Sequence, residues 1–199
     1  MNKVTAAPGK TIDSDGPRSG AVALGWWSRC LDADNGAARA ARARLKRAAS
    51  PADVLALDIT HELYRELRRA KDGRDLRKGD GPVRLALITA ALGSVETHTG
   101  GIGLARRFGA QSRDERPALS PMRFQRILRA PDDWALAVLI RRALPLAGRT
   151  ADVAGLGSDL FHWSDRVRNR WCFEYFGTSP PRRPSDDADP AEIDETESA

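Results

Sequence analysis

The chain has 199 residues, 41% of them hydrophobic and 30% charged, which is typical of one soluble globular domain that buries a core without disulfides or metals. Two cysteines make no disulfide framework, the N-terminal residues contain no apolar signal segment, and the apolar stretch at 134–140 is far shorter than the ~20 residues of a membrane span. We therefore expect a cytoplasmic protein rather than a secreted or membrane protein.

The charge is divided unequally along the sequence. The formal net charge is +5, but seven acidic residues and no basic residue lie in 185–199, which leaves 32 basic against 20 acidic groups, a net of +12, in residues 1–184. A strongly basic body favours a polyanionic partner, of which nucleic acid is the commonest. Only five of the basic residues are lysines, and arginine suits bidentate phosphate contact, although a GC-rich coding bias explains the ratio equally well.

Both ends of the sequence differ in composition from the middle. Residues 1–20 and 178–199 are polar, contain Gly and Pro and lack hydrophobic periodicity, so we predict a disordered N-terminal arm and a disordered acidic tail. Between them, at 21–177, runs of alternating β-branched residues are nearly absent and Ala, Leu and Arg are abundant. This composition predicts a single helical domain without strands.

Four helices are predicted in the first half of this domain. The first covers 22–31, and the second, 36–49, is extremely rich in Ala and Arg. Ser50 followed by Pro51 is a typical helix start, with an N-cap serine and a proline at the first helical position. The third helix begins there and carries apolar residues at every fourth position: Leu55, Ile59, Leu63 and Leu67. After a Gly-containing loop, residues 83–92 are apolar almost all round and predict a buried helix.

The second half begins with a Gly-rich linker at 97–103. Helices are then predicted over 102–108, 120–130, 131–146 and 152–176. The last is either one long helix or two joined near Ser164, and its apolar face holds Leu156, Leu160, Trp163, Val167 and Trp171. The expected fold class is therefore all-α, a compact bundle of about eight to nine helices, either single or divided into two small sub-bundles.

No constellation of residues indicates catalysis. The three histidines and two cysteines are scattered and show neither CxxC nor HExxH spacing, so we predict no metal site. The GGIG at 100–103 lacks the GK[ST] of a phosphate loop and follows no predicted strand, and GxSxG is absent. We therefore expect a protein that is not an enzyme, with no catalytic residues and no cofactor.

Basic residues instead form stripes on the predicted helices. On 36–49 they recur at helical spacing, and on 120–130 three arginines fall within about 120° of one another, opposite Phe124 and Ile127. A single stripe is typical of a solvated face, but four stripes on a body with a net charge of +12 favour binding. We predict that ten of these side chains contact nucleic acid: Arg39, Arg42, Lys46, Arg47, Arg123, Arg126, Arg129, Arg141, Arg142 and Arg166.

The aromatic residues decide between reading bases and holding the backbone. Aromatic residues make up 6% of the chain, and the five tryptophans lie at positions predicted to be in the helix core rather than on an exposed stacking platform. No helix-turn-helix with a polar recognition helix is evident. The sequence therefore favours contact with the nucleic-acid backbone without sequence preference.

Several segments, in a fixed order, carry a family resemblance. They are Trp26-Trp27 before the Asp-Asn-Gly at 34–36, LKRAASPADV at 45–54, GIGLAR at 101–106, RFQRILRA at 123–130 with Arg141-Arg142 after it, and HWSDRVRNRW at 162–171. Together they resemble the small subunit of the type I-E CRISPR complex Cascade, the family called CasB, over about residues 22–177. The chain departs from the family in its longer N-terminal arm, its acidic tail, and an aspartate, Asp165, where a basic residue is expected.

The resemblance implies a fold, partners and a task. The fold is a set of helices in two small bundles, and the partners are the other Cascade subunits, crRNA, target and non-target DNA, and a second copy of the chain. The task is to stabilise the R-loop by holding the displaced DNA strand and bracing the crRNA–target heteroduplex, while base pairing reads the sequence.

Two other readings of the basic stripes stay open. A helical transcription regulator needs a base-reading helix with Asn or Gln among its arginines, for which Gln125 is a lone candidate. A helical assembly adaptor uses its arginines to pair with acidic surfaces of protein partners, which is compatible with the implied family role.

Overall fold

The computed structural model describes residues 17–32, 34–72, 76, 79–110 and 115–178. The predicted acidic tail and most of the predicted N-terminal arm lie outside these residues, although Ser19 and Gly20 of the arm already belong to a helix. Within the described residues the chain forms ten α-helices and two strands of two residues each. The all-α prediction is therefore confirmed, with one helix more than the number expected.

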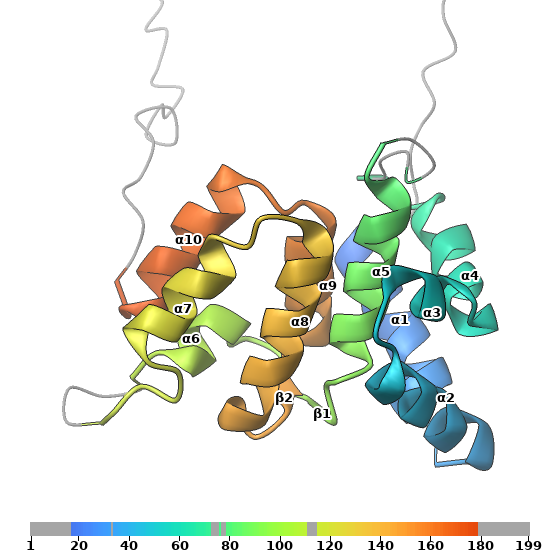
Figure 1. Cartoon of the computed structure of the whole chain (residues 1–199), viewed down its shortest axis with the longest axis horizontal. Coiled ribbons are helices and arrows are strands. Elements are labelled where there is room, and N and C mark those ends of the chain that lie inside the picture. The colour runs from blue at the N-terminus through green and yellow to red at the C-terminus, as the bar shows by residue number, and fades with distance from the viewer. Residues whose placement is uncertain (1–16, 33, 73–75, 77–78, 111–114, 179–199) are drawn as a thin grey trace, which may run out of the picture.

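The first half of the chain occupies the right-hand part of Figure 1. Its elements are α1 (Ser19–Trp27), which continues into a π-helical turn (Ser28–Asp32), α2 (Gly36–Arg47), α3 (Pro51–Leu55), α4 (Asp58–Leu67) and α5 (Gly81–Leu92). The Asn35 side chain accepts a hydrogen bond from the Ala38 amide at 2.8 Å and so caps α2. Ser50 and Asp53 form a reciprocal capping box that starts α3, as the serine–proline pair predicted.

The second half occupies the left-hand part of the same view. Its elements are β1 (Thr97–His98), α6 (Leu104–Phe108), α7 (Pro121–Leu128), α8 (Asp133–Ala143) with a 3₁₀ turn, η2 (Leu144–Ala147), β2 (Thr150–Ala151), α9 (Val153–Phe161) and α10 (Asp165–Tyr175). β1 pairs with β2 in parallel, Thr97 opposite Thr150.

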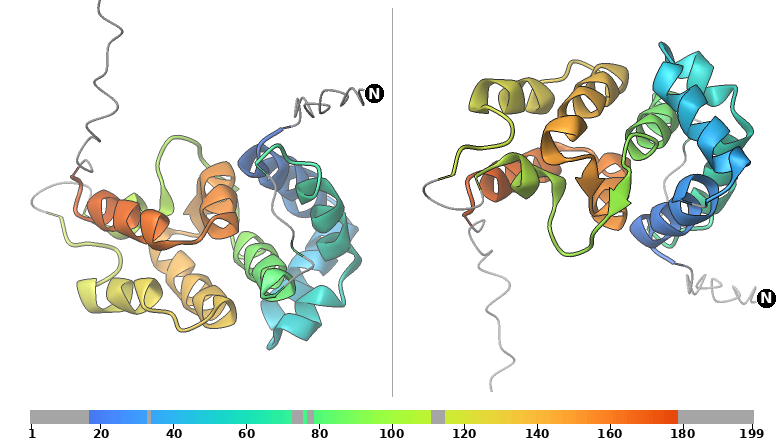
Figure 2. Two further views of the ribbon diagram at one scale, coloured as in Figure 1. Left: turned by 90° about the horizontal axis from the view of Figure 1, so that it is seen from above. Right: turned by 90° about the horizontal axis from the view of Figure 1, so that it is seen from below.

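The two halves share one continuous core rather than two separate ones. α5 packs against α8 and α9, and α1 packs against α9, so α5 lies between the other helices of the first half and the second half (Figure 2). α1 and α9 approach closely through Gly157, where an added Cβ would lie 2.4 Å from the Cβ of Ala23. The Arg84 guanidinium on α5 pairs with Asp133 of α8 at 2.5 Å and donates to the carbonyl of Leu160 at 3.1 Å. The result is a single compact bundle.

Two predicted helices are divided in the structure. The third predicted helix breaks between α3 and α4, where Leu57 is extended and the Val54 carbonyl accepts from both the Leu57 amide, at 3.1 Å, and the Thr60 hydroxyl, at 2.7 Å. The 152–176 segment breaks at Ser164, as one of the two alternatives predicted. The helix predicted to run through Leu146 ends at Ala143 and tightens into η2.

The prediction of helices only was wrong at one place. Thr97, assigned to a Gly-rich linker, forms β1 with His98, and the amides of Glu96 and Thr97 both donate to the Arg149 carbonyl, Glu96 at 2.8 Å. Two residues are too few to show the hydrophobic alternation by which a strand is predicted from sequence. The two paired segments are also more than fifty residues apart, so no local pattern indicates the pairing.

Candidate nucleic-acid interface

α7 turns an apolar face to the core and a row of arginines to solvent. Phe124 and Ile127 are 2% and 1% exposed. The three basic side chains of the stripe are all exposed: Arg123, Arg126 and Arg129. The orientation predicted from helical spacing is therefore confirmed, although the Ser120 hydroxyl makes no capping hydrogen bond.

The end of α10 holds α7 in place. The Tyr175 ring stacks on Phe124 with ring centroids 4.1 Å apart, and the Tyr175 hydroxyl donates to the Leu119 carbonyl at 2.6 Å. An added Cβ at Gly109 would lie 1.9 Å from the Tyr175 carbonyl oxygen, so only glycine permits α10 to end here. The last described residues therefore lie beside α7.

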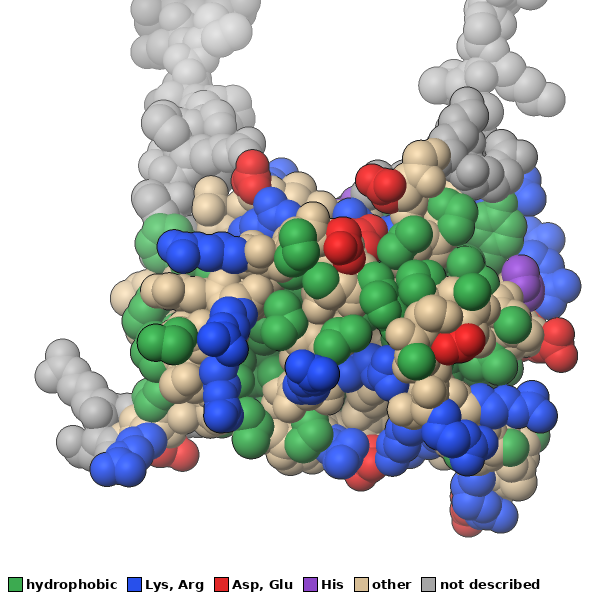
Figure 3. Space-filling model, in the orientation of Figure 1, with side chains coloured by type: hydrophobic (Ala, Val, Ile, Leu, Met, Phe, Trp, Pro, Cys, Tyr) green, Lys and Arg blue, Asp and Glu red, His purple; other side chains and the backbone are tan. Residues whose placement is uncertain are grey.

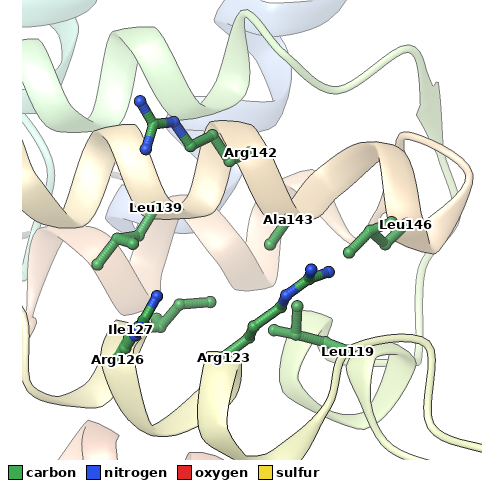
Figure 4. Close-up of a pocket in the computed structure, with 8 residues that line it drawn as sticks. All are labelled: Leu119, Arg123, Arg126, Ile127, Leu139, Arg142, Ala143 and Leu146. Atoms are coloured by element: carbon green, nitrogen blue, oxygen red, sulfur yellow. The ribbon is translucent and has the colours of Figure 1, made fainter.

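A hollow of about 220 Å³ lies between α7 and α8. Figure 4 shows Arg123 and Arg126 beside its apolar floor, and the guanidinium of Arg142 turned toward the other side of α8. The floor residues are Leu119, Ile127, Leu139, Ala143 and Leu146, and the basic residues are Arg123, Arg126 and Arg142. Leu146 is 45% exposed, which is unusual for a leucine that is held in an ordered turn. We call this site the α7–α8 hollow.

The three arginines of the α7–α8 hollow lack acidic neighbours. Among the described residues, none of Arg123, Arg126 and Arg142 has a carboxylate within ion-pair distance. Their positive charges are therefore available to an anion from outside the described part of the chain.

Arg141 and Arg142 are adjacent in sequence but point in different directions. The Arg141 guanidinium donates to the carbonyls of Leu45, Lys46 and Ala48 at 3.1, 2.9 and 2.9 Å. These carbonyls end α2, so Arg141 satisfies groups that a helix C-terminus leaves free. Burial lowers the pKa of Arg141, although a guanidinium stays protonated. Arg142 is exposed and lines two hollows, one on each side of α8.

The second hollow lies between α2 and α8. Its basic lining residues are Lys46, Arg141, Arg142 and Arg149. Glu96 lies within this cluster, 3.0 Å from the Lys46 ammonium and 3.6 Å from Arg149 Nε, and the hydrogen bond from Lys46 is the main cause that lowers the pKa of Glu96. One carboxylate thus partly neutralises the α2–α8 hollow.

The α2 ridge is largely paired with acidic residues of its own segment. Arg39 pairs with Asp34 at 3.0 Å. Arg42 lies 3.8 Å from Asp32, packs over the Trp27 ring at 5.8 Å and is only 22% exposed. The basic stripe predicted on 36–49 is therefore present, but Arg39 and Arg42 already have acidic partners.

The remaining predicted residues lie at the edges. Arg47, at the end of α2, and Arg166, in the first turn of α10, are exposed, and neither lines the two hollows. Arg129 lies with Arg126 and Met122 around a neighbouring shallow depression. Six cations line neighbouring hollows from α7 over α8 to α2, on a face where Figure 3 shows several separate groups of blue side chains in its lower half. We call these six residues the basic track: Arg129, Arg126, Arg123, Arg142, Arg149 and Lys46.

Two residues of this surface were missed from the sequence. Arg149 has a left-handed backbone, with φ of 54°, directly after Gly148, whose φ is 66°, and this turn brings its side chain to Glu96. The glycine that ends η2 is the only signal in the sequence for such a turn. Trp134 is only partly buried and edges the α2–α8 hollow, so the prediction that all five tryptophans lie in the core was wrong for this one.

The described residues offer no other chemistry at this surface. No group of three or more His, Cys, Asp or Glu among them is arranged to hold a metal ion. In the same part of the chain, no helix is both long and apolar enough to cross a bilayer.

A family model matches most of this chain. The family described as CRISPR-associated protein Cse2 matches residues 41–176, which is more than half of the chain. The chain belongs to the Cse2 family. The match covers α3–α10 and all six residues of the basic track, and it confirms the resemblance to the type I-E Cascade small subunit. No curated protein and no solved structure matches this Cse2-family chain.

Proposed function

We propose that this chain is a non-catalytic, cytoplasmic subunit that holds nucleic-acid backbone in Cascade and so stabilises the R-loop during antiviral defence. The basic track contacts the displaced DNA strand or the crRNA–target heteroduplex without reading bases. The observation that carries the proposal is the set of arginines around the α7–α8 hollow that have no acidic partner among the described residues.

The geometry of the track supports phosphate binding. Its cations come from α7 and its C-terminal end, from α8, from α2 and from the turn before β2 that holds Arg149, all in one bundle, so their spacing is set by the fold before any ligand binds. Arginine donates up to five hydrogen bonds in a planar fork that matches phosphate oxygens. Each such contact on a single strand contributes about −0.7 to the slope of log affinity against log salt.

The surface has little capacity for reading bases. Trp134 is the one partly exposed tryptophan among the described residues, whereas the other four are at most 7% exposed. One ring can stack on one base, but a sequence-specific site needs several convergent donors and acceptors on base edges. This favours backbone contact over the alternative of a transcription regulator.

The other proposed partners follow from membership of the complex. We propose that the chain contacts other Cascade subunits and a second copy of itself, and that crRNA, target DNA and non-target DNA pass along the assembled track. The exposed Met122 and Leu146, 68% and 45% exposed, also favour a protein partner near the α7–α8 hollow, as an assembly adaptor requires.

The proposal is tested in reconstituted Cascade by R-loop lifetime. Arg123→Ala with Arg129→Ala removes two exposed cations of the track, and we expect a shorter R-loop lifetime, a larger loss at high salt and unchanged sequence preference. The matched control is Arg65→Ala with Arg69→Ala, which removes the same charge from exposed positions at α4, outside both hollows.

The outcomes separate the alternatives. If the Arg123 and Arg129 variant assembles and keeps the wild-type R-loop lifetime, the proposed function is wrong. If the same variant fails to enter the complex while the isolated chain stays folded, the arginines serve assembly, and the adaptor reading replaces the proposal.

A further inference from the structure

We propose that the acidic segment 185–199 of this chain docks in the α7–α8 hollow, with Ile193 on the apolar floor and the neighbouring carboxylates against the arginines. The docked segment then competes with nucleic acid for the same part of the basic track. The docking stands on the chemistry of the hollow and the segment, whereas the competition rests on the proposed function.

The hollow has two features that a bare phosphate site does not need. Leucine and isoleucine side chains line its floor, and Leu146 remains 45% exposed there. The guanidinium groups of Arg123 and Arg126 lie beside that floor, Arg142 borders it from α8, and none of the three has a carboxylate partner among the described residues. A floor of this kind with cationic sides is complementary to a peptide that carries one apolar side chain between acids.

The segment 185–199 has this pattern. It contains seven acidic residues and no basic residue, and Ile193 is its one large apolar residue, directly between Glu192 and Asp194. With Ile193 directed at the floor, its two acidic neighbours project away from the floor toward the rim, where the arginine side chains lie, since successive side chains of an extended chain point to opposite sides. The acidic residues of the segment are Asp186, Asp187, Asp189, Glu192, Asp194, Glu195 and Glu197.

The segment starts behind α7, on the side of that helix opposite its arginine row. The last described residue, Thr178, follows α10, and Tyr175 of α10 stacks on Phe124 of α7 and bonds to Leu119, which lines the hollow. The 15 residues from Thr178 to Ile193 span up to about 50 Å when extended, so length does not limit access. Tethering at this distance gives the segment an effective concentration on the order of 1 mM at the hollow.

The α7–α8 hollow is a better site for the segment than the α2–α8 hollow. Glu96 already occupies the centre of the second cluster, between Lys46 and Arg149, and would repel incoming carboxylates. The α2 ridge has its own acidic partners in Asp32 and Asp34. The α7–α8 hollow is therefore the proposed docking site, because its arginines have no acidic partners among the described residues.

Docking is tested on the isolated full-length chain by NMR, without nucleic acid. A variant with all seven acids of the segment replaced by Asn or Gln keeps the chain length and removes the charge. We expect the side-chain Nε–Hε signals of Arg123 and Arg126 to shift between wild type and this variant, while that of Arg65 does not. In trans, a synthetic peptide of residues 179–199 should bind the neutralised variant and should bind Arg123→Ala with Arg126→Ala at least fivefold more weakly.

A second peptide separates docking from diffuse attraction. An Ile193→Ser peptide has the same charge and the same length, and we expect it to bind at least threefold more weakly, because it lacks the side chain that covers the floor. If this peptide binds as well as the natural one and the arginine variant also binds unchanged, the contact is diffuse and the docking proposal is overturned. The docking proposal is also overturned if the Nε–Hε signals of Arg123 and Arg126 are the same in the wild-type chain and in the variant with the seven acids replaced.

The competition is measured by the affinity of the full-length chain for a single-stranded oligonucleotide. With an effective concentration on the order of 1 mM and a peptide affinity near 0.1 mM, the free hollow is about one tenth of the total, so neutralising the segment should raise the affinity about tenfold at low salt. An equal gain in a background with Arg123→Ala and Arg126→Ala contradicts competition at this hollow. If neither form binds the oligonucleotide while the NMR shifts are present, the proposed function fails and the docking stands.

Discussion

α2 and α7 both carry rows of basic residues, yet their cations have different surroundings. On α2, Arg39, Arg42 and Lys46 have acidic partners at 3.0, 3.8 and 3.0 Å. On α7, the three arginines have none among the described residues. α2 carries more basic residues than α7, so the difference arises not from the number of cations but from the acids that the fold and the neighbouring sequence bring to each helix. A count of basic residues therefore measures attraction at long range, whereas the local acids decide which cations are free to bind.

The contrast extends to α8, where one arginine serves the fold and its neighbour does not. Arg141 points to the end of α2, and Arg142 points to solvent between the two hollows. Substitutions of engaged and of free cations should therefore have different effects on stability and on binding.

Replacement of Arg84 should have the largest effect on stability. Its guanidinium is 13% exposed and pairs with Asp133, which is 11% exposed, so Arg84→Met leaves an uncompensated buried carboxylate. We expect a loss of about 3 kcal/mol in the free energy of unfolding, measured by urea denaturation. Adding Asp133→Leu should recover part of this loss because it removes the stranded charge. An unchanged denaturation midpoint for the single variant would show that the pair does not join the two halves.

Arg141→Ala and Arg142→Ala form a matched pair of adjacent residues. Arg141→Ala removes three hydrogen bonds to carbonyls at the end of α2, and we expect a loss of about 2 kcal/mol in unfolding free energy. Arg142→Ala should change stability by less than about 0.5 kcal/mol, as exposed substitutions usually do, while weakening oligonucleotide binding. Thermal melting and anisotropy titration on the same samples check both. Equal destabilisation by the two variants contradicts the division of roles.

The salt dependence of binding compares α7 with α2 directly. We expect the isolated chain to bind single-stranded DNA weakly and without sequence preference. Arg123→Ala with Arg129→Ala should reduce the magnitude of the log–log salt slope by about 1.4, the sum of two released contacts. Arg39→Ala with Arg42→Ala should reduce it less, because these cations exchange an existing acidic partner for a phosphate. Fluorescence anisotropy over a salt series measures both slopes, and equal reductions would remove the distinction between the helices.

Glu96→Gln should have the smallest effect, and in the opposite direction. It removes the carboxylate that pairs with Lys46 and Arg149, so both cations become available, and affinity for single-stranded DNA should rise about twofold to fivefold. The side chains of this pair are 42% and 47% exposed, so the stability of the chain should change little. A fall in affinity would indicate that Glu96 positions the cations rather than neutralising them.

Local sequence patterns predict where helices start and which of their faces are buried. The serine–proline pair at Ser50 sets the start of α3, and the spacing of Phe124 and Ile127 sets which side of α7 is buried. The family motifs led to a family that the match over 41–176 confirms. These features depend on residues within one or two helical turns, so the local pattern contains the information.

Which cations are free depends on the distant segments that packing brings beside them. Arg141 and Arg142 are indistinguishable in sequence, and their roles separate because α2 ends beside one of them, more than ninety residues away in the chain. The engagement of Lys46 by Glu96, the left-handed turn that adds Arg149, and the partial exposure of Trp134 likewise depend on segments brought together by packing. Ion pairs act over a few ångströms in space, and the spacing of charges along one helix does not report which distant residues fall within that range.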